Sequence, residues 1–170
     1  MFSADDLGGL IARVCSLRTV AMAITFVPDA GDVLMCDFAG FQAPEMTKVR
    51  RVIVLSPRSR VTFPGTYLVV PVSKTPPSPP ELHHCEFQPR SYQFFDQVES
   101  VWAKADMVTC VASHRLDRVR INGRYSRAQI RKEDLFLIRK AVLHALGMET
   151  WQQAEVIVRT KLIVQEDPAE

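Results

Sequence analysis

The chain has 170 residues, 47% of them apolar and 24% charged, and its formal net charge at pH 7 is +2. A chain of this length can bury one proper hydrophobic core but hardly two, so we expect one main domain. The net charge is too small to indicate nucleic-acid binding by bulk electrostatics, so any RNA site would depend on the local placement of arginines and lysines.

The first 25 residues predict a helical extension. Ser3 can cap a helix with Asp6 three residues on, and apolar residues recur at helical spacing over residues 7–17. Arg13 and Arg18 interrupt the apolar segment, whereas a membrane-spanning helix needs about 20 predominantly apolar residues. We therefore expect an appended arm and no membrane span.

Three strands are predicted in the first half of the chain. Residues 32–38 alternate imperfectly between apolar and polar and end at a loop over residues 40–48, which contains Gly, Pro and polar residues. Residues 52–55 and 67–72 are short apolar or β-branched runs typical of buried strands. Because proline cannot donate to the ladder, Pro71 predicts a sheet edge or a bulge in the third strand.

A proline-rich segment precedes a second group of strands. Residues 75–81 hold four prolines in seven positions and predict a stiff, polyproline II-like loop, with a linker between domains as the alternative. Residues 84–87 and residues 101–110 are two further strand candidates. Residues 117–125 predict a hairpin, because the Asn122-Gly123 pair suits a type I′ turn.

The pattern then changes from strand to helix. Four apolar residues mark one face of an amphipathic helix: Leu135, Ile138, Val142 and Ala145. Gly147 is placed to end this helix, and residues 148–170 form a C-terminal extension. Many short strands closed by one helix fit a small barrel.

The cysteines and histidines do not form a recognisable metal site. The four cysteines lie at positions 15, 36, 85 and 110, without a C-x-x-C pair or a preceding secretory signal, so we expect reduced thiols in a cytoplasmic protein. His83, His84 and Cys85 are the nearest approach to a zinc motif. Adjacent histidines on a strand would point to opposite faces, and no pair has structural-zinc spacing. We expect no metal and no cofactor.

Residues 27–57 follow a distinctive order: a Val-Pro-Asp-x-Gly-Asp segment, a short strand, a polar loop and an arginine-led apolar strand. The residues that carry this pattern are Val27, Pro28, Asp29, Gly31, Asp32, Val33, Asp37, Phe38, Glu45, Arg50, Val54, Leu55, Ser56 and Pro57. The series resembles the opening of the MazF/PemK-type toxin ribonucleases, and the resemblance covers about residues 26–147. It is specific in the first half and weaker after Pro76.

The resemblance implies a mainly β (α+β) fold, namely a small SH3-like barrel of the MazF/PemK/CcdB type with a C-terminal amphipathic helix. The domains would be a helical extension over residues 1–25, a toxin domain over residues 26–147 and an extension over residues 148–170. It also implies a homodimer that cleaves single-stranded RNA, with 2′,3′-cyclic phosphate and 5′-hydroxyl ends, and a cognate antitoxin that displaces the loop over residues 40–48. In a departure from the family, Arg51 replaces the usual proline, and the Gly-rich part of the loop is missing.

The chemistry of metal-independent RNA cleavage indicates which residues act. The phosphorane charge must be held, and Arg50 can do this because a guanidinium stays protonated and donates two parallel hydrogen bonds to phosphate. The resemblance implies a proton-transfer role for Arg50 as well, and a hydrogen bond from Ser73, where the family usually has threonine. Glu45 lies where some members of the family have a carboxylate in the loop, and the resemblance implies that it could accept the 2′-hydroxyl proton. The remaining candidates bind substrate: Lys48, Lys74, Lys104 and Asp106.

Lys104 and Asp106 are expected on one side of their predicted strand, because residues two apart on a strand share a face. Lys104 keeps the charge of the arginine that some relatives have, but not its bidentate fork.

Two further features permit two interpretations each. Four aromatic residues could stack bases or pack in the core: Tyr92, Phe94, Phe95 and Trp102. The arginine-rich stretch over residues 115–131 could track phosphates or be solvated surface.

Two alternatives to the nuclease remain. A CcdB-like protein on the same barrel would poison DNA gyrase by contact, with its decisive residues near the C-terminal helix, where Trp151 is the nearest candidate. A degenerate family member would bind RNA without cutting it. The retained arginine and hydroxyl pair favours the nuclease.

Overall fold

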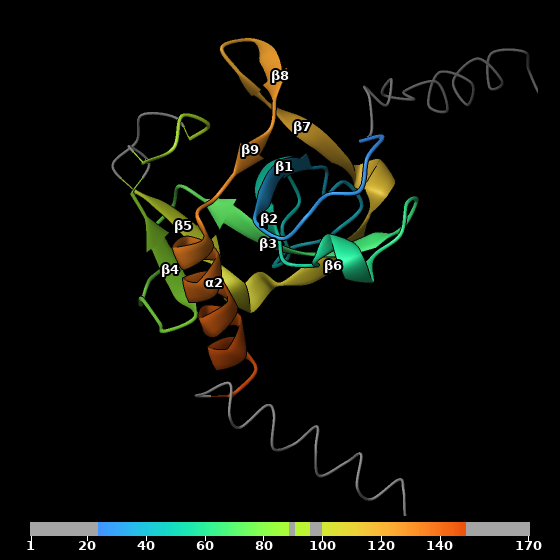
Figure 1. Ribbon diagram of the computed structural model, residues 1–170. Helices are drawn as coiled ribbons and strands as arrows, with labels where there is room; N and C mark the ends of the chain where they lie inside the picture. Colours follow the sequence, from blue (N-terminus) through green and yellow to red (C-terminus); the bar gives the residue numbers. More distant parts are fainter. Residues whose placement is uncertain (1–23, 89–90, 96–99, 149–170) are drawn as a thin grey trace, which may run out of the picture.

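The structure is a computed structural model that describes residues 24–88, 91–95 and 100–148 (Figure 1). The helix expected over residues 7–17 and nearly all of the C-terminal extension lie outside these residues. The described part contains one α-helix, α2 (Lys132–Ala145), and nine strands. None of the described helices is long and apolar enough to cross a bilayer.

All the strand pairs of the described residues are antiparallel, and the main path through the sheet runs β4-β5-β3-β2-β1-β7-β8, with β6 beside β3 and β9 beside β1. The strands are β1 (Asp32–Cys36), β2 (Arg50–Val54), β3 (Thr66–Ser73), β4 (His84–Phe87), β5 (Val101–Lys104), β6 (Thr109–Ala112), β7 (Leu116–Ile121), β8 (Arg124–Ser126) and β9 (Ala128–Gln129). This confirms the expected mainly β fold with a C-terminal helix. The loop over residues 75–81 joins β3 to β4 within the one sheet.

The alternation of side chains in the strands builds two hydrophobic cores. Val52 and Val54 of β2 point to one face of the sheet and pack with Phe38, Tyr67 and other buried residues. Ile53 points to the other face. There the second core contains the buried side of α2 and several aromatic rings, and Figure 1 shows α2 lying beside β4 and β5.

Pro71 is not on an edge strand, so the first of the two expectations, a sheet edge, was wrong, and the bulge stays a prediction. β3 pairs with β2 on one side, and on its other side with β6 through Val69 and with β5 from Val72 onward. The N–H of Leu55 donates to the carbonyl of Leu68. The backbone N–H and C=O groups of the even-numbered residues of β3 therefore point toward β2, and those of odd-numbered residues, including the position of Pro71, point away from it. The missing N–H of Pro71 thus falls where the outer partner changes from β6 to β5.

The single strand expected over residues 101–110 is also wrong, because the chain turns within it. β5 ends at Lys104, a 3-10 turn (η3, Ala105–Met107) follows, and β6 begins at Thr109. The two strands pair with different parts of β3. The turn lets this one segment cover both ends of a long central strand.

The hairpin prediction is confirmed. Asn122 has φ 51° and Gly123 has φ 77°, both in the left-handed region that a type I′ turn requires. β7 and β8 flank this turn with the register Ile121 to Arg124. In Figure 1 the hairpin projects from the sheet at the end opposite α2.

The helix prediction is confirmed except at its last position. Leu135, Ile138 and Val142 are buried as expected, but Ala145 is exposed because the last turn leaves the sheet. Gly147, with φ 74°, ends the helix in a Schellman motif. In this motif the N–H of Met148 donates to the carbonyl of Leu143 at 2.8 Å and that of Gly147 to the carbonyl of His144 at 2.9 Å.

Candidate active site

Arg50 and Ser73 lie on adjacent strands and line one pocket. Val52 pairs with Pro71, and the same register continued by two residues places Arg50 opposite Ser73. Opposite side chains of antiparallel strands lie on the same face. The pocket, here called the strand pocket, has a volume of about 140 Å³. Its polar lining consists of Arg50, Arg51, Ser73, Lys74 and Thr75, and its apolar lining of Met35, Val49, Val72, Phe95 and Val101.

The guanidinium of Arg50 is not fully satisfied. Arg50 begins β2 beside Cys36 of β1, and its Nε is buried without a hydrogen-bond partner among the described residues. A buried donor without a partner costs free energy, and arginine cannot relieve the cost by losing its proton. An acceptor that reached this N–H would relieve the cost, and a phosphate oxygen suits the guanidinium geometry.

The hydroxyl of Ser73 is held in place at the end of β3. Its Oγ accepts a hydrogen bond from the backbone N–H of Thr75 at 3.1 Å. Because a hydroxyl can accept and donate at once, the contact fixes the oxygen and leaves the proton for an acceptor in the pocket. Opposite Ser73 on β5 stands Trp102, whose Nε1 donates to the Oγ of Ser100 at 3.1 Å. An arginine, a hydroxyl and an indole ring therefore form one row across β2, β3 and β5.

Glu45 lies in a different cavity. Its exposed carboxylate accepts the backbone N–H of Gln42 at 3.1 Å within the loop that joins β1 to β2. The cavity, here called the loop cavity, has a volume of about 440 Å³. Its lining is Phe38, Phe41, Pro44, Glu45, Met46, Asp106, Met107, Val108 and Thr109. The structure brings Arg50 and Ser73 together but does not bring Glu45 to them, so the loop would have to move for this carboxylate to act on the same phosphate.

The four expected substrate-binding residues are divided between these places. Lys74 lines the strand pocket, and Lys48 is exposed on the loop that leads into β2. Lys104 is half-buried at the end of β5. Asp106 lines the loop cavity and lies in η3, so the expectation that it shares a strand face with Lys104 was wrong.

His83, His84 and Asp106 place three possible metal-ligand atoms within 4.8 Å of one another. The two imidazole rings lie side by side, with centroids 4.3 Å apart, because His83 precedes β4 and strand alternation does not apply to it. The Nδ1 of His84 accepts the N–H of Glu81 at 3.0 Å, so in the neutral ring Nε2 carries the proton and faces Asp106 at 3.7 Å. A metal ion at Nε2 would have to displace that proton, which disfavours this cluster as a metal site. Burial lowers the pKa of His84, and Asp106 opposes the shift.

Two thiols are unsuited to nucleophilic chemistry at neutral pH. Burial raises the pKa of Cys36 to about 12 and that of Cys85 to about 11. The thiolate is the reactive form, so both act as structural apolar groups.

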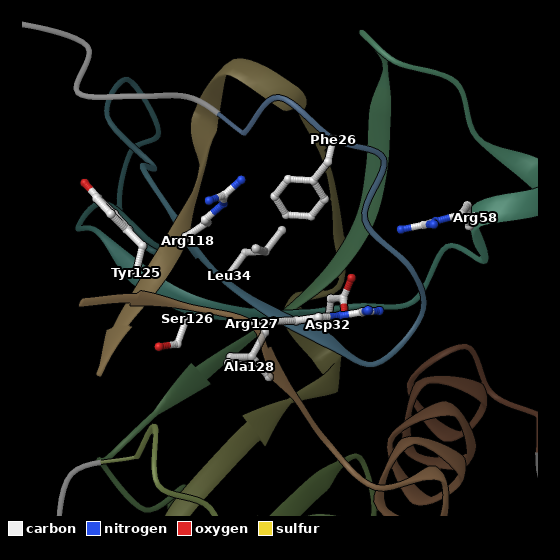
Figure 2. Close-up of a pocket in the computed structure, with 10 residues that line it drawn as sticks. Phe26, Asp32, Leu34, Arg58, Arg118, Tyr125, Ser126, Arg127 and Ala128 are labelled. Carbon is white, nitrogen blue, oxygen red and sulfur yellow. The ribbon is translucent and has the colours of Figure 1, made fainter. Parts of the chain in front are cut away.

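A third pocket was not assigned from the sequence. It lies at the base of the β7-β8 hairpin, has a volume of about 230 Å³ and is here called the hairpin pocket (Figure 2). Its lining is Phe26, Asp32, Val33, Leu34, Arg58, Arg118, Tyr125, Ser126, Arg127 and Ala128. The arginine-rich stretch over residues 115–131 was the one signal for it. Phe26 and Arg58 come from distant parts of the chain, so the pattern alone could not show a pocket.

These features define a small, mainly β protein in which an arginine and a hydroxyl on adjacent strands line one pocket. The sequence matches the PemK-like, MazF-like toxins of type II toxin-antitoxin systems over residues 29–145, and the chain belongs to this family.

The chain is also similar to a curated protein and to several solved structures. The chain is 31% identical over 147 residues to the uncharacterized protein YifN of Escherichia coli (strain K12), with 74% of this chain and 96% of that protein covered. The fold is similar to an endoribonuclease from a mycobacterial species, with a TM-score of 0.52, 15% identity and coverage of 74% of this chain and 96% of that one. MazF from Deinococcus radiodurans has a TM-score of 0.53 and 21% identity over 72% of this chain and 99% of that one. A MazE-MazF complex from the same organism has a TM-score of 0.50 and 22% identity over 72% of this chain and 98% of that one.

Proposed function

We propose that this protein is a metal-independent endoribonuclease that cleaves single-stranded RNA in the strand pocket. One observation carries the proposal: Arg50, with its buried and unpartnered Nε, lies across from the Ser73 hydroxyl on the neighbouring strand. Family membership supports it, as do the names of two proteins of similar fold, an endoribonuclease and a MazF.

In the proposed reaction, the 2′-hydroxyl of the RNA attacks the adjacent phosphorus and the P–O5′ bond breaks. The products have a 2′,3′-cyclic phosphate and a 5′-hydroxyl. Arg50 donates to the non-bridging oxygens as negative charge develops on them, and Ser73 donates a further hydrogen bond. Because β2 and β3 hold both groups before the RNA arrives, little reorganisation accompanies the reaction.

Two protons must move during this reaction, one from the attacking 2′-hydroxyl and one to the leaving 5′-oxygen. We assign the first to Glu45, which reaches the phosphate after its loop leaves the loop cavity. Lys74, which lines the strand pocket beside Arg50, supplies the second from its ammonium group. Lys48, Lys104 and Asp106 position the RNA on either side of the scissile bond.

The test is incubation of purified protein with a long single-stranded RNA in EDTA, with the cut ends mapped. We expect sequence-selective cuts with 5′-hydroxyl ends that disappear in Arg50→Ala and weaken in Ser73→Ala. Lys140→Ala, on an exposed part of α2, is the matched control. Intact RNA from folded wild-type protein would contradict the proposal and would make inhibition of DNA gyrase the next assay.

The role of Glu45 has a separate test. If it accepts the 2′-hydroxyl proton, Glu45→Gln lowers kcat and removes the acid limb of the pH-rate profile. A Glu45→Gln enzyme with an unchanged pH profile would assign this residue to the loop structure alone.

We further propose a cognate antitoxin and a homodimer. Family membership and the MazE-MazF complex of similar fold support the antitoxin, whose segment would displace the loop over residues 40–48. The dimer rests on the resemblance alone. The mass of the purified protein in solution tests the dimer. Suppression of RNA cleavage by the product of a neighbouring small open reading frame tests the antitoxin.

A further inference from the structure

The hairpin pocket carries more positive than negative charge. Its lining includes three guanidiniums, those of Arg58, Arg118 and Arg127, and one carboxylate. That carboxylate, Asp32, is buried and lies 3.4 Å from the Nε of Arg127, so the two charges offset each other. The lining keeps two further guanidiniums, those of Arg58 and Arg118, and its other walls are mainly apolar. The carboxylate of Asp29 lies beside Arg58 but outside the lining, so the excess positive charge is greatest at Arg118.

The arginines are held in position before any ligand binds. The Nη2 of Arg58 donates to the carbonyl of Val27 at 2.9 Å, and its backbone N–H donates to the carboxylate of Asp29 at 2.9 Å. The Cζ of Arg118 lies 5.2 Å from the centroid of the Phe26 ring. Figure 2 shows Arg118 on one side of this ring and Arg58 on the other. The charged groups therefore frame a flat aromatic surface.

Flat groups recur beside the pocket. The guanidinium of Arg120 lies over the ring of Tyr125 at 4.5 Å and donates to its hydroxyl at 2.6 Å. Aromatic rings and guanidinium planes are the surfaces on which unpaired bases stack. The volume of about 230 Å³ is below the range of about 300–1,000 Å³ that is typical of pockets for drug-sized ligands. One planar, singly anionic group such as a nucleotide suits this space.

The hairpin pocket and the strand pocket both include residues of β1, namely Leu34 in the first and Met35 in the second. On β1, Cys36 pairs with Arg50 and Leu34 pairs with Arg118, from β2 on one side and β7 on the other. Because residues two apart on a strand face the same way, both arginines lie on one face. Strand spacing and rise place their Cα atoms about 12 Å apart, which a few nucleotides can span.

We propose that the hairpin pocket binds one nucleotide of the single-stranded RNA outside the cleaved bond, with the base against Phe26, the phosphate at Arg118 and Arg58 adding positive charge on the other side of the ring. The inference rests on the proposed function, since RNA held in the strand pocket brings its flanking nucleotides to this face. An acidic peptide would also satisfy the arginines. The stacking surfaces and the shared face with Arg50 favour RNA.

The experiment measures binding by fluorescence anisotropy, using RNA with the mapped cleavage sequence made uncleavable by a 2′-O-methyl group. A short version is compared with one extended by several nucleotides on both sides. We expect wild-type protein to bind the extended RNA about tenfold more tightly than the short one, as one stacked base typically contributes. Arg118→Gln and Phe26→Leu should each remove this advantage, and Arg118→Gln should reduce the salt slope by about one unit.

Arg124→Gln is the matched control, because Arg124 is an exposed arginine of the same hairpin that does not line the pocket. Equal losses in Arg118→Gln and Arg124→Gln would indicate general charge attraction and overturn the inference. So would an unchanged advantage in both pocket variants, or a loss confined to binding of an acidic antitoxin segment. Thermal unfolding shows whether each variant is folded. Binding to this pocket is measured on uncleavable RNA, whereas catalysis is measured on cleavable RNA with Arg50→Ala alongside. Failure of the proposed catalysis is therefore distinguishable from failure of this pocket.

Discussion

Arg50 and Arg118 flank the same strand, yet their surroundings differ. Arg50 has a buried Nε without a hydrogen-bond partner among the described residues. Within the same part of the chain, no Asp or Glu lines the strand pocket. Arg118 stacks on Phe26 in a pocket that also contains the carboxylate Asp32. An arginine with an unsatisfied donor in a cavity suits transient charge that appears during a reaction. An arginine supported by an aromatic ring suits steady binding.

The largest effect we expect comes from Arg50. Arg50→Ala should lower kcat by about 10²- to 10³-fold, the usual loss when a preorganised donor to a developing anion is removed. Arg50→Lys should restore little, because an ammonium cannot donate in the bidentate fashion. Steady-state cleavage of a defined RNA measures both.

Arg50 should contribute little to stability, in contrast to its effect on rate. Replacing a half-buried, incompletely satisfied guanidinium by an apolar chain removes an unpaired donor. The free energy of unfolding of Arg50→Met should therefore differ from wild type by less than about 1 kcal/mol. A large loss of stability in urea unfolding would show that Arg50 is structural and would undermine the comparison with Arg118.

Ser73 should have the next largest effect. Ser73→Ala removes a hydrogen bond to a charged group and should lower kcat by about tenfold or more. Ser73→Thr keeps the hydroxyl, fixes its rotamer and should retain or raise activity. Equal activity in the alanine and threonine variants would remove the hydroxyl from the mechanism.

The sequence predicted the strand pocket better than the hairpin pocket, and strand register explains the difference. Arg50 begins one short apolar strand and Ser73 ends the next, and the family resemblance paired them before the register was known. Phe26, Arg58 and Arg118 come from a coil, a 3-10 turn (η1, Arg58–Arg60) and a hairpin, and no periodic pattern relates such segments. The turn at Ala105–Met107 was missed for a similar reason, since its residues continue an apolar run whose pairing partner changes in space.

Asp32 of the hairpin pocket should contribute more to the free energy of unfolding than Arg50 of the strand pocket does. Its buried carboxylate accepts the N–H of Asp29 at 2.8 Å, so Asp32→Ala leaves that donor unsatisfied and should cost about 1–3 kcal/mol of unfolding free energy. Arg127, the exposed partner of Asp32, has a side chain that is 66% accessible. Arg127→Gln should cost less than about 1 kcal/mol, as exposed ion pairs do. If the two variants lost equal stability in urea unfolding, the ion pair and not the backbone contact would be the main role of Asp32.

Acid should destabilise the start of β4 at His84 and then the turn at Asp29, with the smallest effects of this set. Burial, reinforced by His83, lowers the pKa of His84 from 6.5, so the folded state holds fewer protons than the unfolded chain and stability falls as the pH drops below about 6.5. The backbone N–H groups of Arg58 and Ala30 lower the pKa of Asp29 from 3.8. Its contribution is therefore complete above that value and is lost only as the pH falls through the lower folded pKa. Urea unfolding over a pH series should show that His84→Gln flattens the first decline and Asp29→Asn the second. If the first decline in stability persists in His84→Gln, a titrating group other than His84 causes it.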